Sequence, residues 1–154
     1  MEKKGKLSSI ITQNIDGLHS KAGNKRVLEL HGSVHRNYCM KCNKSYTLTQ
    51  MMKLKDNLRC SECGGLLKPD VVLYEEMLNE EILDKSIEAI KEADLLIIAG
   101  TSLVVAPASS LPYLFKGSQI AIVNLGPTPF DKYASIKIED KVERVFQHIK
   151  IRKL

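Results

Sequence analysis

The four cysteines of this chain form two pairs in the pattern C-x2-C-x17-C-x2-C. Two thiolate pairs at this spacing can close a tetrahedron around one Zn²⁺. Every cysteine belongs to a pair and no export signal is evident, so metal ligation in a reducing cytoplasm is favoured over a disulfide framework. The sequence therefore predicts a cytoplasmic protein with one structural zinc ion, held by Cys39, Cys42, Cys60 and Cys63.

Composition limits the classes of protein that this chain can belong to. Its 154 residues, 44% hydrophobic and 27% charged, are typical of a globular protein with one substantial core. No apolar run is long enough to span a bilayer, so we expect no membrane partner. The first 63 residues carry 12 Lys/Arg against 5 Asp/Glu, which is compatible with an anionic partner. They contain only two aromatic residues, Tyr38 and Tyr46, so we do not expect nucleic acid as that partner.

Hydrophobic periodicity predicts an α/β protein. Strands are expected at residues 7–12, 27–30, 70–74, 95–99 and 119–124. Helices are expected at residues 47–56, between the two CxxC pairs, at residues 79–93 with Asn79 as the N-cap, at residues 107–115 and from residue 140 onward. The alternation of helix and strand over residues 79–150 favours a doubly wound, Rossmann-like parallel sheet. In this interpretation residues 1–36 and 68–154 form the Rossmann-like part, and residues 37–67 form an inserted zinc ribbon.

Three polar residues follow the first expected strand: Gln13, Asn14 and Asp16. Ligands of open α/β sheets bind beyond the carboxyl ends of the strands. Amide and carboxylate side chains at that edge can hold ribose hydroxyls and a carboxamide. Asn and Asp also favour turns for purely local reasons, so a simple Asx-turn is the alternative for this cluster.

His31 and the tripeptide Gly100-Thr101-Ser102 are the next candidates. Imidazole suits proton transfer near neutral pH, although a single histidine before a glycine is more often structural. The tripeptide follows an apolar strand and offers backbone N–H groups and hydroxyls to a dinucleotide, but many strands end in such a turn. Neither feature specifies a function by itself.

Together, these segments resemble the sirtuin family. TQNIDGLH, ELHG, the two CxxC pairs, KPDVVLY, AGTSLVVAPA and IVNLGPTPFD stand in the order and approximate spacing of that family. The resemblance runs from about residue 6 to about residue 146. Sirtuins are NAD-dependent protein lysine deacylases, so the resemblance implies NAD as the cofactor and an acyl-lysine protein or peptide as the substrate.

The resemblance also implies a role for each motif. His31 would be the general base that activates a ribose hydroxyl, after the acyl oxygen has attacked NAD and nicotinamide has left, so that the acyl group ends on ADP-ribose. Asn14 and Asp16 would join His31 in catalysis and, with Gln13, would hold the nicotinamide side and ribose of the cofactor. The remaining cofactor contacts would be Gly100, Thr101, Ser102, Asn124, Leu125, Gly126, Asp140 and Lys141. The strand that pairs with the substrate peptide would consist of Val72, Leu73, Tyr74 and Glu75.

Two departures from the family pattern modify these expectations. Complete sirtuins begin with a strand, a glycine-rich GAGxS loop and an IPDFR segment, which this sequence lacks. We therefore expect an incomplete doubly wound sheet, weak or no deacylase activity of the chain alone, and rescue by a separate N-terminal fragment or by oligomerisation. Where many sirtuins carry Phe-Gly-Glu, this chain has Tyr74-Glu75-Glu76, and we expect Glu75 to favour substrates with basic flanks.

Three alternatives stay open. The chain is a catalytically inactive sirtuin remnant that acts as a zinc-containing binding or structural module, or a zinc ribbon that binds nucleic acid, or a sirtuin-like mono-ADP-ribosyl transferase, which breaks the same cofactor bond. Zinc content with a cooperative melt tests the first alternative, and the salt dependence of binding tests the second.

Overall fold

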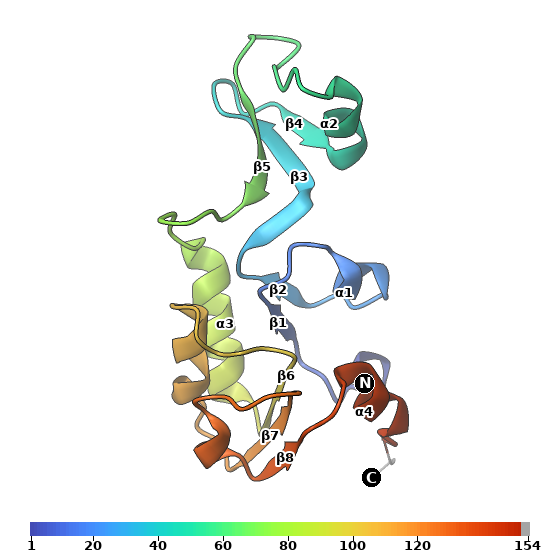
Figure 1. Ribbon diagram of the computed structural model, residues 1–154, viewed down its shortest axis with the longest axis vertical. Helices are drawn as coiled ribbons and strands as arrows, with labels where there is room; N and C mark the ends of the chain where they lie inside the picture. The colour runs from blue at the N-terminus through green and yellow to red at the C-terminus, as the bar shows by residue number, and fades with distance from the viewer. Residues whose placement is uncertain (152–154) are drawn as a thin grey trace. The chain divides into compact units, whose positions relative to one another are not determined.

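The computed structural model describes residues 1–151, which form two compact units. One unit is Ser9–Leu83, and the other combines Met1–Ser8 with the described residues from Asp84 onward. Figure 1 labels the helices and strands of both. No described helix is both long and apolar enough to cross a membrane. The division of the chain into a Rossmann-like part with a ribbon inserted at residues 37–67 stays a prediction.

The unit Ser9–Leu83 contains two small sheets. Strand β1 (Ile10–Thr12) pairs in parallel with β2 (Val27–Glu29), and the short helix α1 (Leu18–Lys21) lies between them in the chain. The second sheet is antiparallel, with strand order β4-β3-β5. Its strands are β3 (Gly32–Cys39), β4 (Ser45–Thr47) and β5 (Leu67–Val71).

Helix α2 (Leu48–Leu54) closes the ribbon core. Thr47 begins it with a capping box, because the Thr47 hydroxyl accepts from the amide of Gln50 while the Gln50 side chain accepts from the amide of Thr47. Met51 on this helix packs against buried residues of the antiparallel sheet and its loops. The helix expected between the two CxxC pairs is confirmed. The members of this core are Cys39, Tyr46, Met51, Cys60 and Leu67.

The strand expected over residues 70–74 is wrong in its position. Strand β5 covers Leu67–Val71, and Tyr74 and Glu75 form a turn beyond it. The pairing with β3 sets these bounds, since Cys39 lies opposite Leu67 and Gly32 lies opposite Val71. Pro69 is tolerated inside β5 because this strand lies at the edge of its sheet.

The other unit is built on a parallel sheet of strand order β6-β7-β8. Its strands are β6 (Leu95–Ala99), β7 (Gln119–Val123) and β8 (Ile136–Ile138). The central strand β7 is the most buried, and its Ile122 packs with Ile98 and Phe130 in the core. The strands expected at 95–99 and 119–124 are therefore confirmed, apart from one terminal residue, and β8 was not expected.

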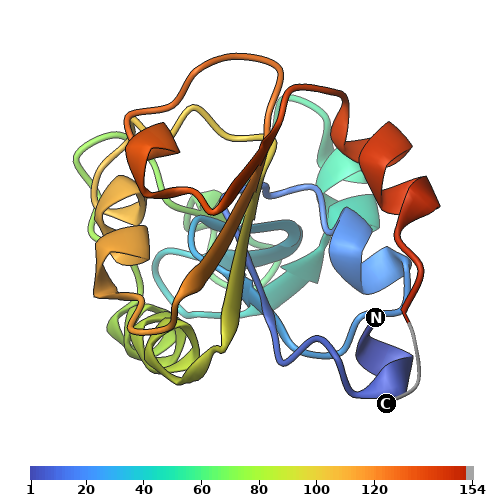
Figure 2. The ribbon, with the colours of Figure 1, turned by 90° about the horizontal axis from the view of Figure 1, so that it is seen from below.

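Helices lie on both sides of these three strands. In Figures 1 and 2, α3 (Glu80–Glu92) and the 3₁₀ helix η2 (Ala108–Leu114) lie to one side, and α4 (Val142–His148) lies to the other. This is the layer arrangement of a doubly wound α/β fold. Asn79 caps α3 as expected, since its Oδ1 accepts from the amide of Ile82 at 3.0 Å. Two shorter 3₁₀ helices are η1 (Glu2–Lys4) and η3 (Asp131–Tyr133).

The start of one expected strand and the type of one expected helix are corrected. The first strand begins at Ile10 rather than at Leu7. The helix expected over residues 107–115 is a 3₁₀ helix with Pro112 inside it, and a proline there removes an N–H donor from any α-helical ladder.

Candidate functional site

His31 lies immediately before β3, and its ring is held in a defined orientation. Its Nδ1 lies 3.0 Å from the main-chain oxygen of Gln13. A carbonyl oxygen can only accept, so Nδ1 carries the proton and Nε2 keeps its lone pair in the neutral ring. An imidazole fixed in this tautomer presents Nε2 as a proton acceptor, which is the arrangement that a general base requires.

The position after this histidine, Gly32, requires a glycine for two reasons. Its φ is +75°, a left-handed conformation that disfavours side chains. A Cβ at this position would also collide with the carbonyl oxygen of Asp70 on β5. The close approach brings the end of β5 against the backbone of His31, whose carbonyl accepts from the amide of Val72 at 3.1 Å.

The loop with Gln13, Asn14 and Asp16 follows β1 and is stabilised by hydrogen bonds from backbone amides to nearby side chains. The amide of Asn14 donates to the Thr12 hydroxyl at 3.0 Å, and the carboxylate of Asp16 accepts from the amide of Leu18 at 2.9 Å. The structure therefore brings the three predicted residues into one loop beside His31, and it also contains the Asx-turn that was their alternative explanation.

A pocket lies at the carboxyl ends of β6 and β7, with a volume of about 370 Å³. Five of the eight other predicted cofactor contacts line it: Gly100, Asn124, Leu125, Asp140 and Lys141. Two further residues of α4, Val142 and Glu143, complete the lining. The volume falls within the range of small-molecule sites, and its position is the one where open α/β sheets bind ligands.

Backbone geometry at the ends of these strands shapes the pocket. Gly100 has a φ of +63°, and a Cβ there would approach Val142 Cγ2 at 3.3 Å. The Asn124 side chain donates to the carbonyl of Gly126 at 3.0 Å, which curls the chain after β7. Thr101 accepts from the amide of Leu103 through its hydroxyl, in a local turn. Thr101, Ser102 and Gly126 do not belong to the pocket lining.

The four cysteines converge. Their sulfur atoms all lie within 4.8 Å of one another, with Cys39 and Cys63 at 3.4 Å and Cys42 and Cys60 at 3.6 Å. A tetrahedral Zn(Cys)₄ centre with Zn–S bonds of about 2.3 Å has sulfur–sulfur edges of about 3.8 Å. The four sulfurs therefore fit zinc, and because all four positions would be protein ligands the site is of the closed, structural kind.

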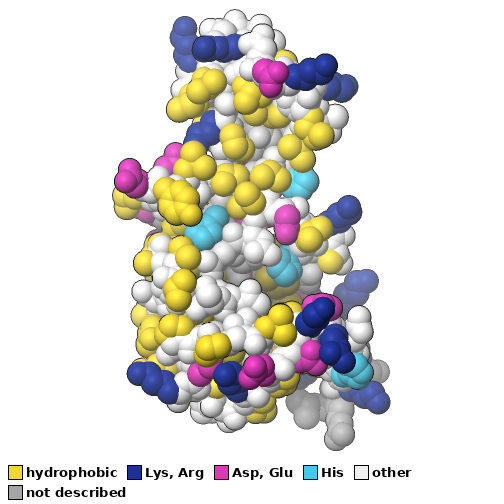
Figure 3. All heavy atoms as spheres, in the orientation of Figure 1, with side chains coloured by type: hydrophobic (Ala, Val, Ile, Leu, Met, Phe, Trp, Pro, Cys, Tyr) yellow, Lys and Arg dark blue, Asp and Glu magenta, His cyan; other side chains and the backbone are white. Residues whose placement is uncertain are grey.

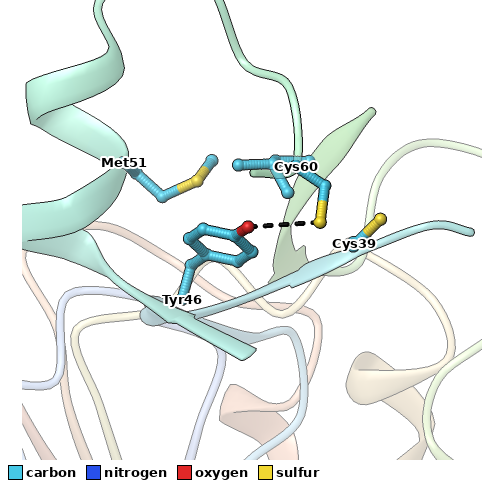
Figure 4. Close-up of a cluster of buried hydrophobic side chains, with 5 residues drawn as sticks. Cys39, Tyr46, Met51 and Cys60 are labelled. Carbon is cyan, nitrogen blue, oxygen red and sulfur yellow. Dashed lines mark hydrogen bonds between the residues drawn. The ribbon is translucent and has the colours of Figure 1, made fainter. Parts of the chain in front are cut away.

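The environment of these thiols favours a bound cation. The Tyr46 hydroxyl donates to Cys60 Sγ at 3.2 Å and lowers the pKa of Cys60 to about 6 (Figure 4). At Cys42 the amide of Lys44 lowers the pKa, but hydrogen bonds with the other thiols outweigh it and raise the pKa to about 12. Four thiols so close together cannot all lose their protons unless a positive charge lies among them. Zinc supplies that charge.

The predicted substrate segment, Val72 to Glu75, follows β5 as an exposed loop. Tyr74 is fully exposed, and Glu75 adopts a φ of +69°. Glu76 stabilises the loop through its carboxylate. This group accepts a hydrogen bond from the amide of Leu73 at 2.9 Å and forms an ion pair with the Lys68 ammonium at 2.7 Å. In Figure 3, hydrophobic and acidic side chains lie together at this loop.

Several contributors to these sites were not expected from the sequence. Tyr46 donates to a zinc-site sulfur, and Ser33 and His35 on β3 reach the loop after β1. The sequence shows only that Ser33 and His35 are two residues apart and so share one face of a strand, and it does not show which loop they contact. Val142 and Glu143 directly follow two predicted contacts.

Comparison with known proteins identifies the relatives of this chain. The model of the Sir2 family matches residues 1–107. The NAD-dependent protein deacetylase of Clostridium acetobutylicum is 50% identical over 150 residues, which cover 97% of this chain and 61% of the relative. The protein of the same name in Clostridium tetani is 50% identical over 143 residues, covering 92% and 58%. The chain thus spans about three fifths of the length of these curated relatives.

Solved structures agree with this match. A structure of Sir2 with a p53 peptide and NAD⁺ has a TM-score of 0.87 and 41% identity, covering 95% of this chain and 65% of that one. A structure of Sir2Tm bound to a propionylated peptide has a TM-score of 0.89 at 41% identity, with the same two coverages.

Proposed function

The chain belongs to the Sir2 family, and we propose that it carries out the NAD-dependent deacylation of lysine side chains in proteins, releasing nicotinamide and O-acyl-ADP-ribose. The observation that carries this proposal is the ring of His31, whose Nδ1 bond to Gln13 leaves Nε2 as a proton acceptor beside a loop of amide and carboxylate groups. The names of the curated relatives and the NAD⁺ and peptides in the related structures support the same activity.

In this proposal different residues hold different parts of the cofactor. The pocket with Gly100, Asn124 and Asp140 takes the adenosine part, and Gln13, Asn14 and Asp16 hold the nicotinamide side and its ribose. When bound, NAD supplies the glycosidic bond whose cleavage lets ADP-ribose accept the acyl group. His31 takes a proton at Nε2, and Gln13 stabilises the charged ring through its carbonyl.

The substrate would bind beside β5 as an added strand. Two apolar side chains of this segment are accessible to a partner, with Leu73 half-exposed and Tyr74 fully exposed, which supports a site for β-augmentation next to this edge strand. Glu75 adds a negative charge to this loop, which supports a preference for acyl-lysines with basic flanks. Replacing Glu75 with Gly tests this, since an unchanged preference for Lys- or Arg-flanked peptides would refute it.

A further strand is part of the proposal. Among the described residues β6 pairs only with β7, although its sequence Leu-Leu-Ile-Ile-Ala is that of a strand buried within a parallel sheet. Leu95 at its start is half-exposed. An apolar strand edge of this kind recruits a partner strand. We expect that strand from a complementing polypeptide or a second copy of this chain, and full turnover to depend on it.

The compartment that we propose is the cytoplasm, because four zinc-binding thiols persist where cysteines stay reduced. The alternative function, a zinc-containing binding module without catalysis, is favoured by the same open edge of β6.

The test is a deacylation assay. The zinc-loaded chain is incubated with NAD and an acetyl-lysine peptide, with and without the segment of the Clostridium acetobutylicum relative that lies outside the matched region. We expect equal amounts of nicotinamide and deacetylated peptide, and a strong increase when the segment is added. No product under either condition would leave the binding-module function in place of the enzyme.

A further inference from the structure

His31, just before β3, and Ser33 and His35, on β3, contact carbonyl groups of the loop that follows β1. His31 Nδ1 contacts the carbonyl of Gln13 at 3.0 Å, and Ser33 Oγ lies 3.5 Å from the carbonyl of Ile15. The third member of the series is His35, whose Nε2 lies 2.9 Å from the carbonyl of Asp16. Ser33 and His35 lie two residues apart on β3 and share one face of it, and His31 reaches the same loop from the turn before the strand.

The His35 ring makes two contacts with this loop. Because the Asp16 carbonyl can only accept, Nε2 of His35 must carry a proton and donate. The ring also covers Gly17 so closely that a Cβ on Gly17 would lie 2.8 Å from His35 Cδ2. An alanine here would adopt an unfavourable φ of +67° and would also have to displace the His35 ring.

The turn that His35 contacts also begins helix α1. The Asp16 carboxylate accepts from the amide of Leu18 at 2.9 Å, and the Gly17 carbonyl accepts from the amide of Lys21 at 3.0 Å. Helix α1 has four residues, too few to hold its own first turn in place. The conformation of Asp16 and Gly17 therefore depends on contacts from outside the helix, and His35 supplies one to each of them.

We propose that His35 is a positioning residue. Its Nε2–H donates to the Asp16 carbonyl and its ring covers Gly17, and together these contacts fix the turn from which the Asp16 side chain projects. The consequence for the cofactor, tighter binding of NAD, rests on the proposed function. The consequence for the turn does not.

Three variants separate the two contacts. His35→Ala removes both. His35→Phe keeps a ring over Gly17 but has no donor. His35→Gln restores the donor, because the Gln Nε2 is the same number of bonds from Cβ as the His Nε2. His148→Gln is the matched control, since His148 is another exposed histidine that contacts a main-chain carbonyl, that of Arg144, in the other compact unit.

The first readout is hydrogen exchange at the amides of Leu18 and Lys21 in the zinc-loaded full chain. We expect their protection to fall about 3- to 10-fold in His35→Ala and His35→Phe, as the loss of one hydrogen bond implies, and to recover in His35→Gln. The amide of Leu67 in the ribbon should keep its protection, which shows that the unit remains folded. Unchanged protection at Leu18 in His35→Ala, or an equal loss in His35→Gln, would overturn the proposal.

The second readout is calorimetric titration of NAD into the same variants. Weaker binding in His35→Ala that recovers in His35→Gln supports the consequence for the cofactor, and a loosened turn with unchanged NAD affinity contradicts it. If the unmodified chain binds no NAD, the proposed function fails, while the exchange data still decide the role of His35. In Gly17→Ala, a second substitution His35→Ala should cost less than it does alone, because the ring has already been displaced.

Discussion

His31 Nδ1 and the carbonyl oxygen of Gln13 lie 3.0 Å apart, a contact that joins the start of β3 to the loop after β1. This contact separates the two functions of the ring. One nitrogen anchors the side chain to the backbone, and the other is left for chemistry. A substitution that keeps only the anchor can therefore test the role of the second nitrogen.

His31→Asn is that substitution, because the Asn amide nitrogen occupies the position of Nδ1 and Asn has no basic nitrogen. We expect thermal stability to change little and the rate of nicotinamide release to fall about 10²- to 10⁴-fold, the usual contribution of a general base. His31→Ala should lose both the anchor and the activity. Release at the normal rate by His31→Asn would show that another group takes the proton.

Glu75 stands in a left-handed conformation that glycine adopts without cost, with a φ of +69°. We therefore expect Glu75→Gly to raise the free energy of unfolding by about 0.5–1 kcal/mol in a denaturant titration. The neighbouring Glu76→Gly should lower it, because Glu76 accepts from the amide of Leu73 and pairs with Lys68. Opposite effects at adjacent glutamates would identify backbone strain as the cause, and destabilisation by both would refute it.

Tyr46 links the ribbon core to the zinc site through its hydroxyl. The hydroxyl donates to Cys60 Sγ and accepts from the amide of Ser61 at 3.0 Å. Tyr46→Phe keeps the ring in the core and removes both bonds, so zinc affinity should fall about 10- to 100-fold, as for other groups that orient metal ligands. Competition with a chelator of known affinity measures this. Met51→Leu is the control for packing, and an equal loss there would assign the effect to the core instead.

Asp131 makes the stability of the parallel-sheet unit depend on pH in the acidic range. Lys137 at 2.7 Å, and then the Thr128 hydroxyl, lower its pKa from 3.8 to about 2. The unfolded chain therefore binds this proton more readily than the folded chain does. The stabilisation is complete above about pH 4 and is lost as the pH falls to about 2.

We expect Asp131→Asn to be less stable than the unmodified chain at pH 6 and to show a shallower loss of stability between pH 4 and 2 in urea titrations. Parallel pH profiles for the two proteins would contradict the assignment.

Local sequence was sufficient for features that depend on neighbouring residues. The cysteine spacing predicted the cluster of four sulfurs, and the apolar run at 95–99 predicted β6 within a parallel sheet. The position of β5 could not be predicted in the same way, because its bounds are set by its register with β3, a strand about thirty residues away in the chain. The sequence pattern predicted a strand that begins after Pro69, whereas the pairing with β3 produces a strand that contains Pro69.

The candidate site shows the same limit. Asn14, Asp16 and His31 could be named from their residue types, but His35 could not, because its partner is a main-chain carbonyl in a distant loop. Likewise, the pocket gathers Gly100, Asn124 and Asp140 from three separate segments, and their proximity follows from the parallel order of β6, β7 and β8.

The pocket contains a position that can be altered with a closely matched control. Gly100 and Gly5 have φ values of +63° and +64°, so an alanine costs the backbone about the same at both. Only at Gly100 would the added Cβ press on a pocket residue, Val142, whereas Gly5 has no atom within 4 Å of that point.

Calorimetric titration of NAD into the zinc-loaded chain, with Gly100→Ala, Gly5→Ala and Asn14→Ala beside it, tests the central claim most directly. The account predicts a dissociation constant between about 1 μM and 1 mM, weakened about tenfold or more by Gly100→Ala, weakened by Asn14→Ala, and unchanged by Gly5→Ala. The absence of binding, or equal affinities for Gly100→Ala and the unmodified chain, would contradict the claim that these residues hold NAD.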